Sequence, residues 1–315
     1  MAKPTVIEGE KGLNIERITW NGLTWVNIEK PTPKETEYLA QNYPFHQLDL
    51  DDCVSRIQRP KIDEYEDYLF VVLHFPLFSK EERVTVPSQV SIFIGRCFLI
   101  TLHAGELKPL VNLFKDCQLN EEARQANMKS PGYLLHRIID RLVDYCFPIL
   151  DKMMANIERL EEDIFDTRTP DPIEDLGELR RDIISFRRVI WPMRAVIGSL
   201  EQRAKRFTPE DMEVYWGDVV DHVDKIWDTL DECKEIIDGL NETGGILASH
   251  HTNQVIRVLT IIATIMMPLT LLASIYGMNI RLPGQEHDLS FIVLLLIMLF
   301  TIGSMLFWFH RRHWI

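Results

Sequence analysis

An uncharged stretch near the C-terminus carries polar side chains at helical spacing. Residues 258–280 hold no charged side chain, yet hydroxyl, amide and small residues recur there. Residues three or four positions apart share one face of a helix. This face comprises Asn253, Ile256, Leu259 or Thr260, Ala263, Met267, Thr270, Ser274 and Gly277. Such a mixed face either lines a watery path for ions or packs against another membrane helix, and spacing alone leaves both interpretations open.

The polar face ends at Gly277, Met278 and Asn279. A ring of Asn279 amides from several copies would present neutral carbonyl oxygens to a cation. Mg2+ loses its water reluctantly, so oxygens that bind the hydrated ion suit selection with rapid release. Gly277 allows neighbouring backbones to approach closely. The alternative is an ordinary helix C-cap, where Gly and Asn are both common.

Further residues of the same stretch bear on gating and metal binding. Leu259 and Met267 can form apolar constrictions that gate by dewetting. Pro268 lacks an N–H group and therefore permits a kink. His250 and His251 precede the polar face. Adjacent positions on a helix point about 100° apart, so one helix cannot chelate a metal with both histidines, and their role stays open.

Two apolar segments are long enough to cross a membrane. Residues 258–280 and 289–309 form uncharged runs of 23 and 21 residues, and a spanning helix needs about 20. Two buried core helices are the alternative, but soluble helices normally show a polar face. We therefore predict membrane helices over about 255–279 and over 289–310, with an outer loop at 281–288. Because two helices cannot enclose a pore, a conduit requires several copies around an axis.

The charges beside these segments predict their orientation. Arg311 and Arg312 follow the second segment, in a basic tail over 311–315, and positive residues favour the cytoplasmic side. The N-terminal residues contain no apolar run, which predicts no signal peptide. We therefore expect a multi-pass protein of the cell (inner) membrane with both termini in the cytoplasm.

The composition narrows the function classes. The chain has 34 basic and 47 acidic residues, a net charge of −13, which argues against a nucleic-acid partner and suits work beside cations. Five cysteines without a CxxC pair argue against a disulfide framework. No GxxxxGK[ST], GxSxG or HExxH motif occurs. We therefore expect no enzyme activity and no organic cofactor.

The first 128 residues carry both strand and helix patterns. Strand-like segments flank Asn21-Gly22, a hairpin signal, and others cover 68–78, 88–95 and 97–103. Residues 31–43 read as a helix with Thr32 as its cap. The pattern predicts an α+β cytosolic domain over 1–128, an α/β/α sandwich.

Long helices are predicted beyond this domain. Pro170 and Pro172 separate helices over 133–169 and 173–206, so that 129–206 forms a helix pair. A third helix starts at Pro209 and continues into the membrane, making 207–280 a stalk joined to the first span. Residues 180–206 hold eight bases and two acids, whereas 210–242 hold twelve acids and two bases, so these stretches can pair. Gly244-Gly245 is a candidate bend.

These features together resemble the CorA family of divalent-cation channels. The resemblance rests on RVLTIIATIMMPLTLLASIYGMN (257–279), the second apolar segment and the HRRHW tail. QRPKIDEYEDYLFVVLHF (58–75) and RRVIWPMRAVIGSL (187–200) also resemble the soluble domain of the family. The resemblance covers essentially the whole chain. It implies a CorA-like homopentamer in a lipid bilayer, with five first spans around the pore.

The resemblance also implies roles for single residues. Gly277, Met278 and Asn279 would form the selectivity filter, and the pore-lining residues would be Asn253, Ile256, Leu259, Met267 and Thr270. A regulatory Mg2+ between adjacent cytosolic domains would be held by Asp52 and Asp218, with Asp51 as a neighbouring candidate. Arg311 and Arg312 would form a basic girdle near the gate.

The function implied is a channel for Mg2+, and for Co2+ or Ni2+, closed by internal Mg2+. A divalent ion gains about 4.6 kcal/mol per 100 mV of inward-negative potential, which suffices to drive influx. The outer loop IRLPGQEHDLS lacks the MPEL sequence common in the family, although Glu286 and Asp288 can gather cations. A ZntB-like zinc transporter is the alternative within the family. A membrane-tethered sensor or enzyme is the alternative outside it.

Overall fold

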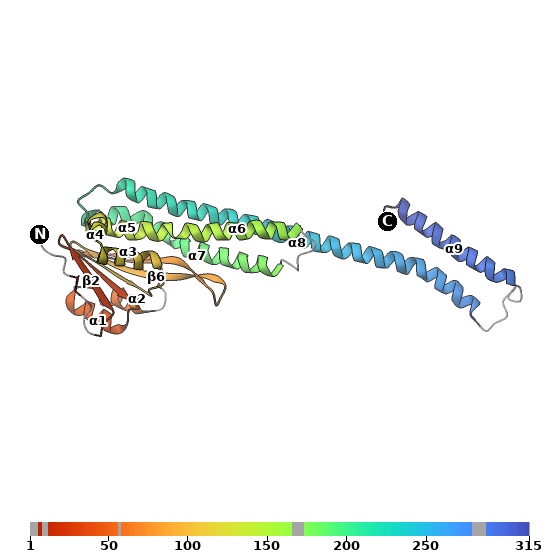
Figure 1. Ribbon diagram of the computed structural model, residues 1–315, viewed down its shortest axis with the longest axis horizontal. Helices are drawn as coiled ribbons and strands as arrows, with labels where there is room; N and C mark the ends of the chain where they lie inside the picture. Colours follow the sequence, from red (N-terminus) through yellow and green to blue (C-terminus); the bar gives the residue numbers. More distant parts are fainter. Residues whose placement is uncertain (1–5, 8–11, 56–57, 166–172, 279–287, 315) are drawn as a thin grey trace. The chain divides into compact units, whose positions relative to one another are not determined.

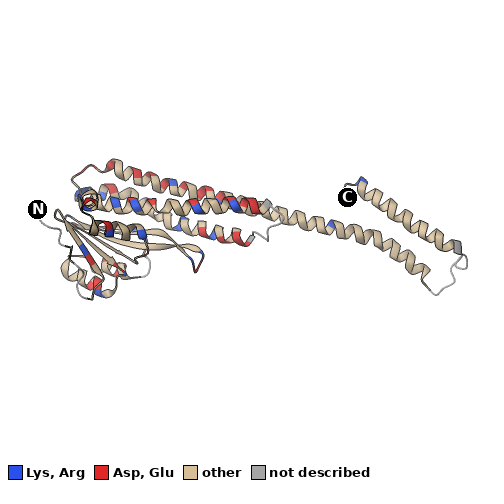
Figure 2. Ribbon diagram, viewed as in Figure 1, with Lys and Arg blue, Asp and Glu red and all other residues tan. Residues whose placement is uncertain are grey.

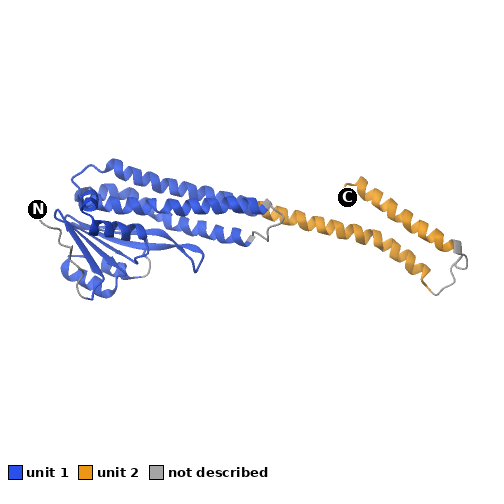
Figure 3. Cartoon of the chain, in the orientation of Figure 1, with its two compact units in different colours: residues 1–241 blue, residues 242–315 orange. Residues whose placement is uncertain are grey.

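A computed structural model describes residues 6–7, 12–55, 58–165, 173–278 and 288–314 (Figure 1). The chain divides into two compact units, residues 1–241 and 242–315 (Figure 3). The boundary falls inside one helix, α8 (Glu213–Tyr276), which belongs to both units. This helix runs unbroken through Gly244, Gly245 and Pro268.

The described part of the first unit contains a seven-stranded sheet in the order β1-β2-β3-β7-β6-β5-β4. β3 and β7 pair in parallel, and the other neighbours are antiparallel. The hairpin predicted at Asn21-Gly22 is confirmed, since both residues adopt positive φ angles, 46° and 82°, as a tight two-residue turn requires. The strands are β1 (Val6–Ile7), β2 (Ile15–Trp20), β3 (Leu23–Glu29), β4 (Lys61–Glu64), β5 (Tyr68–Ser79), β6 (Val84–Gly95) and β7 (Phe98–His103).

Both faces of the sheet are covered, which explains why its central strands are apolar without alternation. On β5, Leu69, Val71 and Leu73 join one hydrophobic cluster, whereas Phe70 and Val72 join the other. The smaller cluster packs under α1 (Pro33–Asn42) and α2 (Gln47–Val54). The larger one extends into the long helices on the opposite face. The predicted α/β/α sandwich is therefore confirmed, as is the Thr32 cap of α1.

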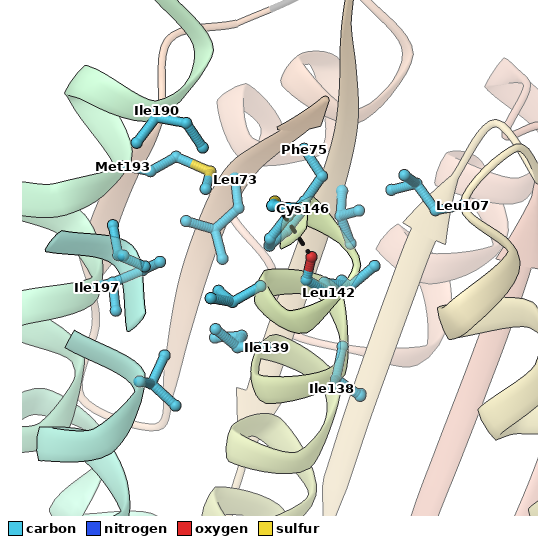
Figure 4. Packing of buried hydrophobic residues seen from close by; sticks show 14 of the residues in the cluster. Leu73, Phe75, Leu107, Ile138, Ile139, Leu142, Cys146, Ile190, Met193 and Ile197 are labelled. Carbon is cyan, nitrogen blue, oxygen red and sulfur yellow. Dashed lines mark hydrogen bonds between the residues drawn. The ribbon is translucent and has the colours of Figure 1, made fainter. Parts of the chain in front are cut away.

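The helices on the second face form one core with the sheet (Figure 4). Leu73 and Phe75 of β5 meet Ile139 and Leu142 of α5 in this fully buried cluster. These helices are α3 (Lys108–Leu119), α4 (Glu121–Asn127), α5 (Pro131–Asp144), α6 (Cys146–Phe165), α7 (Ile173–Ala204), the short 3-10 helix η1 (Lys205–Phe207) and α8.

The single helix predicted from residue 133 onward is wrong at Tyr145, where α5 ends and α6 begins. Pro148 accounts for the break. It has no N–H group to donate to the carbonyl of Asp144, and its ring clashes with that carbonyl. Pro192, by contrast, lies inside α7 without ending it.

The basic and acidic stretches of α7 and α8 pair as expected (Figure 2). Arg180 contacts Asp238 at 3.1 Å, and Arg194 contacts Asp224 at 2.7 Å. Midway between them Arg187 pairs with Asp231. The partners step by seven residues along both helices in opposite directions, which is the register of an antiparallel coiled coil. Each partly exposed pair contributes only about 0–1 kcal/mol, so the apolar seam supplies most of the stability.

Candidate cation pathway and regulatory carboxylates

Two helices of the second unit expose apolar surface that water does not tolerate. The C-terminal half of α8 and residues Ser290–Arg311 of α9 (Asp288–Arg311) are long and apolar enough to cross a membrane. Met267 is 77% exposed and Phe300 76%. Charged residues are nearly absent from this stretch of the ribbon (Figure 2). Side chains of this kind are stable in lipid or against neighbouring helices, which makes both helices candidate membrane spans.

The hydroxyl groups of α8 have a consistent arrangement along the first span. The Oγ1 atoms of Thr260, Thr264 and Thr270 each donate to the carbonyl four residues earlier, all at 2.7 Å. The hydroxyl proton is thereby used inside the helix, and the oxygen lone pairs remain free to accept. Such oxygens can accept hydrogen bonds from the waters of a hydrated cation.

The five predicted pore-lining residues are all exposed on α8. Ile256, Leu259 and Met267 are 53%, 61% and 77% exposed, and Asn253 and Thr270 are exposed as well. Because α8 is helical throughout this region, their steps of three or eight residues keep them on one side of the helix. The set is thus available either to a pore or to a neighbouring helix.

The predicted filter begins where α8 ends. The helix stops at Tyr276, and the N–H of Gly277 donates to the carbonyl of Ala273 at 2.9 Å. A Cβ atom on Gly277 would lie 3.2 Å from that carbonyl oxygen, so a side chain would be crowded against backbone. Met278 is half exposed. Asn279 and Glu286 lie outside the described residues.

Asp51 and Asp52 lie on α2, in the first unit. Asp52 forms an ion pair with Lys61 of β4 at 2.7 Å, and Lys61 also contacts Asp63 at 2.5 Å. Although burial opposes it, hydrogen bonding to both carboxylates raises the pKa of Lys61. Asp51 accepts a hydrogen bond from Gln47 at 3.0 Å. A lysine therefore occupies one side of the carboxylate that was predicted to bind a metal.

A buried carboxylate anchors α2 and with it these two residues. Asp49 is 1% exposed and accepts hydrogen bonds from the hydroxyls of Tyr65 at 3.2 Å and Tyr68 at 3.1 Å. Tyr68 in turn accepts from the N–H of His46, the residue that caps α2. The network fixes the helix against the sheet, and sequence inspection did not single it out.

This network predicts a pH-dependent stability. Burial raises the pKa of Asp49 above its ordinary value of about 3.9, against hydrogen bonds from Tyr68 and Tyr65 that lower it. The contribution of the protonated Asp49 side chain to folding stability is therefore full at low pH. It is lost as the pH rises through the raised pKa. We expect the Tm of Asp49→Asn to improve relative to that of the wild type as the pH rises above about 4, the ordinary pKa of an aspartate. Thermal unfolding of both proteins in detergent at several pH values measures the Tm difference. Asp151→Asn, which replaces an exposed aspartate, is the control. A Tm difference between Asp49→Asn and wild type that does not change with pH contradicts the prediction.

Asp218 lies on α8 within the first unit, with 65% of its side chain exposed. Its carboxylate is 3.9 Å from Nε2 of His222, whose Nδ1 is 3.3 Å from Asp144 of α5. Burial raises the pKa of Asp144. Across the described ranges, no three His, Cys, Asp or Glu side chains gather closely enough to hold a metal ion. A metal bound at Asp52 or Asp218 would therefore need ligands from elsewhere, such as a second subunit or water.

The predicted basic girdle follows the end of α9. Arg311 is the last residue of the helix, and the N–H of Arg312 donates to the carbonyls of Trp308 and Phe309, each at 3.1 Å. The guanidinium of Arg312 lies 5.7 Å from the Trp308 ring centroid. His313 adopts a φ of 57°, and the N–H of Trp314 reaches back to Phe309 at 3.0 Å, which closes the helix in a Schellman-like turn. His250 and His251 are exposed on α8.

An α/β/α domain, an antiparallel helix pair and two terminal spanning helices define a membrane protein with a large soluble front part. Comparison with known proteins identifies the class further. Residues 20–311 match the family model described as CorA-like Mg2+ transporter protein. The chain belongs to this family and is a metal-ion transporter, not an enzyme.

Relatives and solved structures support the assignment over nearly the whole chain. The cobalt/magnesium transport protein CorA of Thermotoga maritima is 30% identical over 295 residues, 93% of this chain and 83% of that protein. The zinc transport protein ZntB of Cronobacter sakazakii is 22% identical, covering 92% and 88%. The CorA magnesium transporter of Methanocaldococcus jannaschii has a similar fold, with a TM-score of 0.80, 21% identity and coverage of 95% and 96%.

Proposed function

We propose that this transporter is a Mg2+ channel that also passes Co2+ and Ni2+, driven by the membrane potential. The observation that carries the proposal is the 30% identity to a cobalt/magnesium transport protein along 93% of the chain. It would assemble as a homopentamer in the cell (inner) membrane, with both termini in the cytoplasm.

The first span supports passage of a hydrated ion. Its exposed face combines apolar side chains with threonine oxygens that can only accept hydrogen bonds, because their protons are bonded within the helix. Neutral acceptors bind the water shell of Mg2+ weakly enough to release it. Asn279 would complete this set at the outer mouth, beside Gly277 and Met278. Arg311 and Arg312 would form a positive ring near the cytoplasmic gate.

Regulation by internal Mg2+ would depend on carboxylates of adjacent subunits. Asp52 and Asp218 belong to different elements of the first unit, and neither has the companions that a metal site needs within the described part of one chain. Two such carboxylates facing each other across a subunit interface repel one another unless a dication lies between them. Mg2+ bound there, with Asp51 nearby, would hold the channel closed.

A zinc transporter is the second candidate, because the chain is 22% identical to a ZntB protein over 92% of its length. The two candidates differ in the ion and in the driving force. A zinc transporter of this kind would carry Zn2+ without requiring an imposed potential.

Flux into liposomes tests the proposal. Purified protein is reconstituted, an inside-negative potential is imposed, and Mg2+ influx is followed with and without external cobalt hexammine, which mimics hydrated Mg2+ but keeps its ligands. We expect potential-dependent influx that cobalt hexammine blocks. Zn2+ uptake without Mg2+ influx would establish the zinc candidate, and no uptake of either ion would contradict a channel.

A further inference from the structure

The first unit contains a pocket of about 870 Å3 between the sheet and the α7–α8 pair. Its walls include Arg59, His74 of β5, Arg187, Arg188 and Trp191 of α7, and Trp227 of α8. Ligand pockets of small molecules typically measure about 300–1,000 Å3 and combine apolar walls with a few polar groups. The pocket is far from the pore-lining residues in sequence, and neither the ion pathway nor the regulatory carboxylates use it.

The charge of this pocket is positive, in a chain whose net charge is −13. Two of its cations are neutralised, because Arg187 pairs with Asp231 and Lys234 pairs with Asp238 at 3.0 Å. Arg59 and Arg188 are exposed and form no ion pair with any described residue. Two uncompensated guanidinium groups repel the transported cations and favour an anion, above all one with phosphate or carboxylate oxygens.

One ring nitrogen of a buried histidine in the wall lacks a hydrogen-bond partner among the described residues. His74 is 6% exposed, and its Nε2 has no partner within the part of the chain that the structure describes. Buried polar nitrogen atoms are nearly always hydrogen-bonded in native proteins. Burial lowers the pKa of His74, so the ring is neutral near pH 7. Its Nε2 can then donate or accept one hydrogen bond with a polar ligand atom, depending on the tautomer.

Trp191 and Trp227 supply aromatic surface to the pocket. Their ring centroids are 4.9 Å apart and the rings are tilted by 47°. The guanidinium of Arg187 lies 4.5 Å from the Trp227 centroid and so covers that ring. Trp191 remains 61% exposed. An exposed indole beside free guanidinium groups is suited to stack on a planar ring whose substituent is anionic.

From these features we propose that the pocket binds a nucleotide, with its base stacked on Trp191 and its phosphates at Arg59 and Arg188. His74 Nε2 would form a hydrogen bond with a polar atom of the same ligand. The proposal is independent of which metal ion the protein transports. It adds a site for an anionic ligand to the first unit of a protein whose other proposed sites bind cations.

Equilibrium dialysis of the full-length protein in detergent tests this, with radiolabelled ATP in EDTA so that no metal bridges ligand and protein. We expect saturable binding. Arg188→Ala should weaken it at least about tenfold, the loss expected for one charge-assisted phosphate contact. Arg181→Ala is the matched control, since Arg181 is exposed on the same helix and does not line the pocket. Trp191→Ala should weaken ATP binding and leave tripolyphosphate binding unchanged.

Three results would overturn the proposal. The first is no saturable ATP binding at millimolar concentration, which is also the result if a neighbouring subunit covers the pocket. The second is equal affinity of Arg188→Ala and Arg181→Ala. The third is an affinity for tripolyphosphate equal to that for ATP, together with unchanged ATP binding by Trp191→Ala. This result would show that the pocket recognises the phosphates alone and not the base. Size-exclusion chromatography of every variant shows that assembly is intact.

Discussion

Asn279→Ala is expected to reduce potential-driven Mg2+ influx to the level of protein-free liposomes. The amide oxygen would accept hydrogen bonds from the hydration shell of the ion, and a methyl group offers no acceptor. With the acceptor lost from every copy in a ring, the ion meets an apolar mouth. Transfer of a hydrated dication past apolar side chains is strongly unfavourable, because its waters would lose their outer hydrogen bonds.

The measurement is Mg2+ influx at a fixed imposed potential, normalised to the amount of reconstituted protein. Asn241→Ala is a matched control, because Asn241 is an exposed amide on α8 outside the apolar segment. The control should conduct as wild type does. If Asn279→Ala assembles normally and shows the same Mg2+ influx as the wild type, a ring of Asn279 amides does not select the ion.

Much of the fold follows from local patterns in the sequence. The Asn21-Gly22 turn, the Thr32 cap and the apolar strands of the sheet each depend on residues close together in the chain, and the structure confirms them. The same holds for the long apolar segment within α8. The helix break at Tyr145 was not predicted, although Pro148 marks it in the sequence.

Features that depend on packing between distant segments could not be predicted in the same way. The bases of α7 and the acids of α8 indicated attraction, but the register of Arg180, Arg187 and Arg194 against their partners depends on how the apolar seam packs. Lys61 was likewise not expected to neutralise Asp52, because their contact requires α2 and β4 to pack together. The roles of Asp52 and Asp218 stay predictions, since they concern contacts between chains.

The second large effect is expected from the regulatory carboxylates. Asp218→Ala, alone or combined with Asp52→Ala, should leave Mg2+ influx high at internal Mg2+ concentrations that close the wild-type channel. Removal of one carboxylate deletes a ligand and also relieves the repulsion that a bound dication would neutralise. Influx into liposomes preloaded with increasing Mg2+ measures the inhibition. Asp228→Ala, an exposed carboxylate on the same helix, is the control and should be inhibited as wild type is.

A substitution at Lys61 is expected to have the opposite effect and to make the channel more sensitive to internal Mg2+. Its ammonium group lies 2.7 Å from Asp52 and so competes with Mg2+ for that carboxylate. Lys61→Met keeps the length of the side chain and removes the competitor, so that the Mg2+ concentration for half inhibition should fall about tenfold, the size of one charge-assisted hydrogen bond. The exposed Lys34→Met should not shift it. Asp218→Ala could abolish the inhibition while Lys61→Met leaves the Mg2+ concentration for half inhibition unchanged. That pair of results would mean that Asp218 binds the regulatory metal and Asp52 does not.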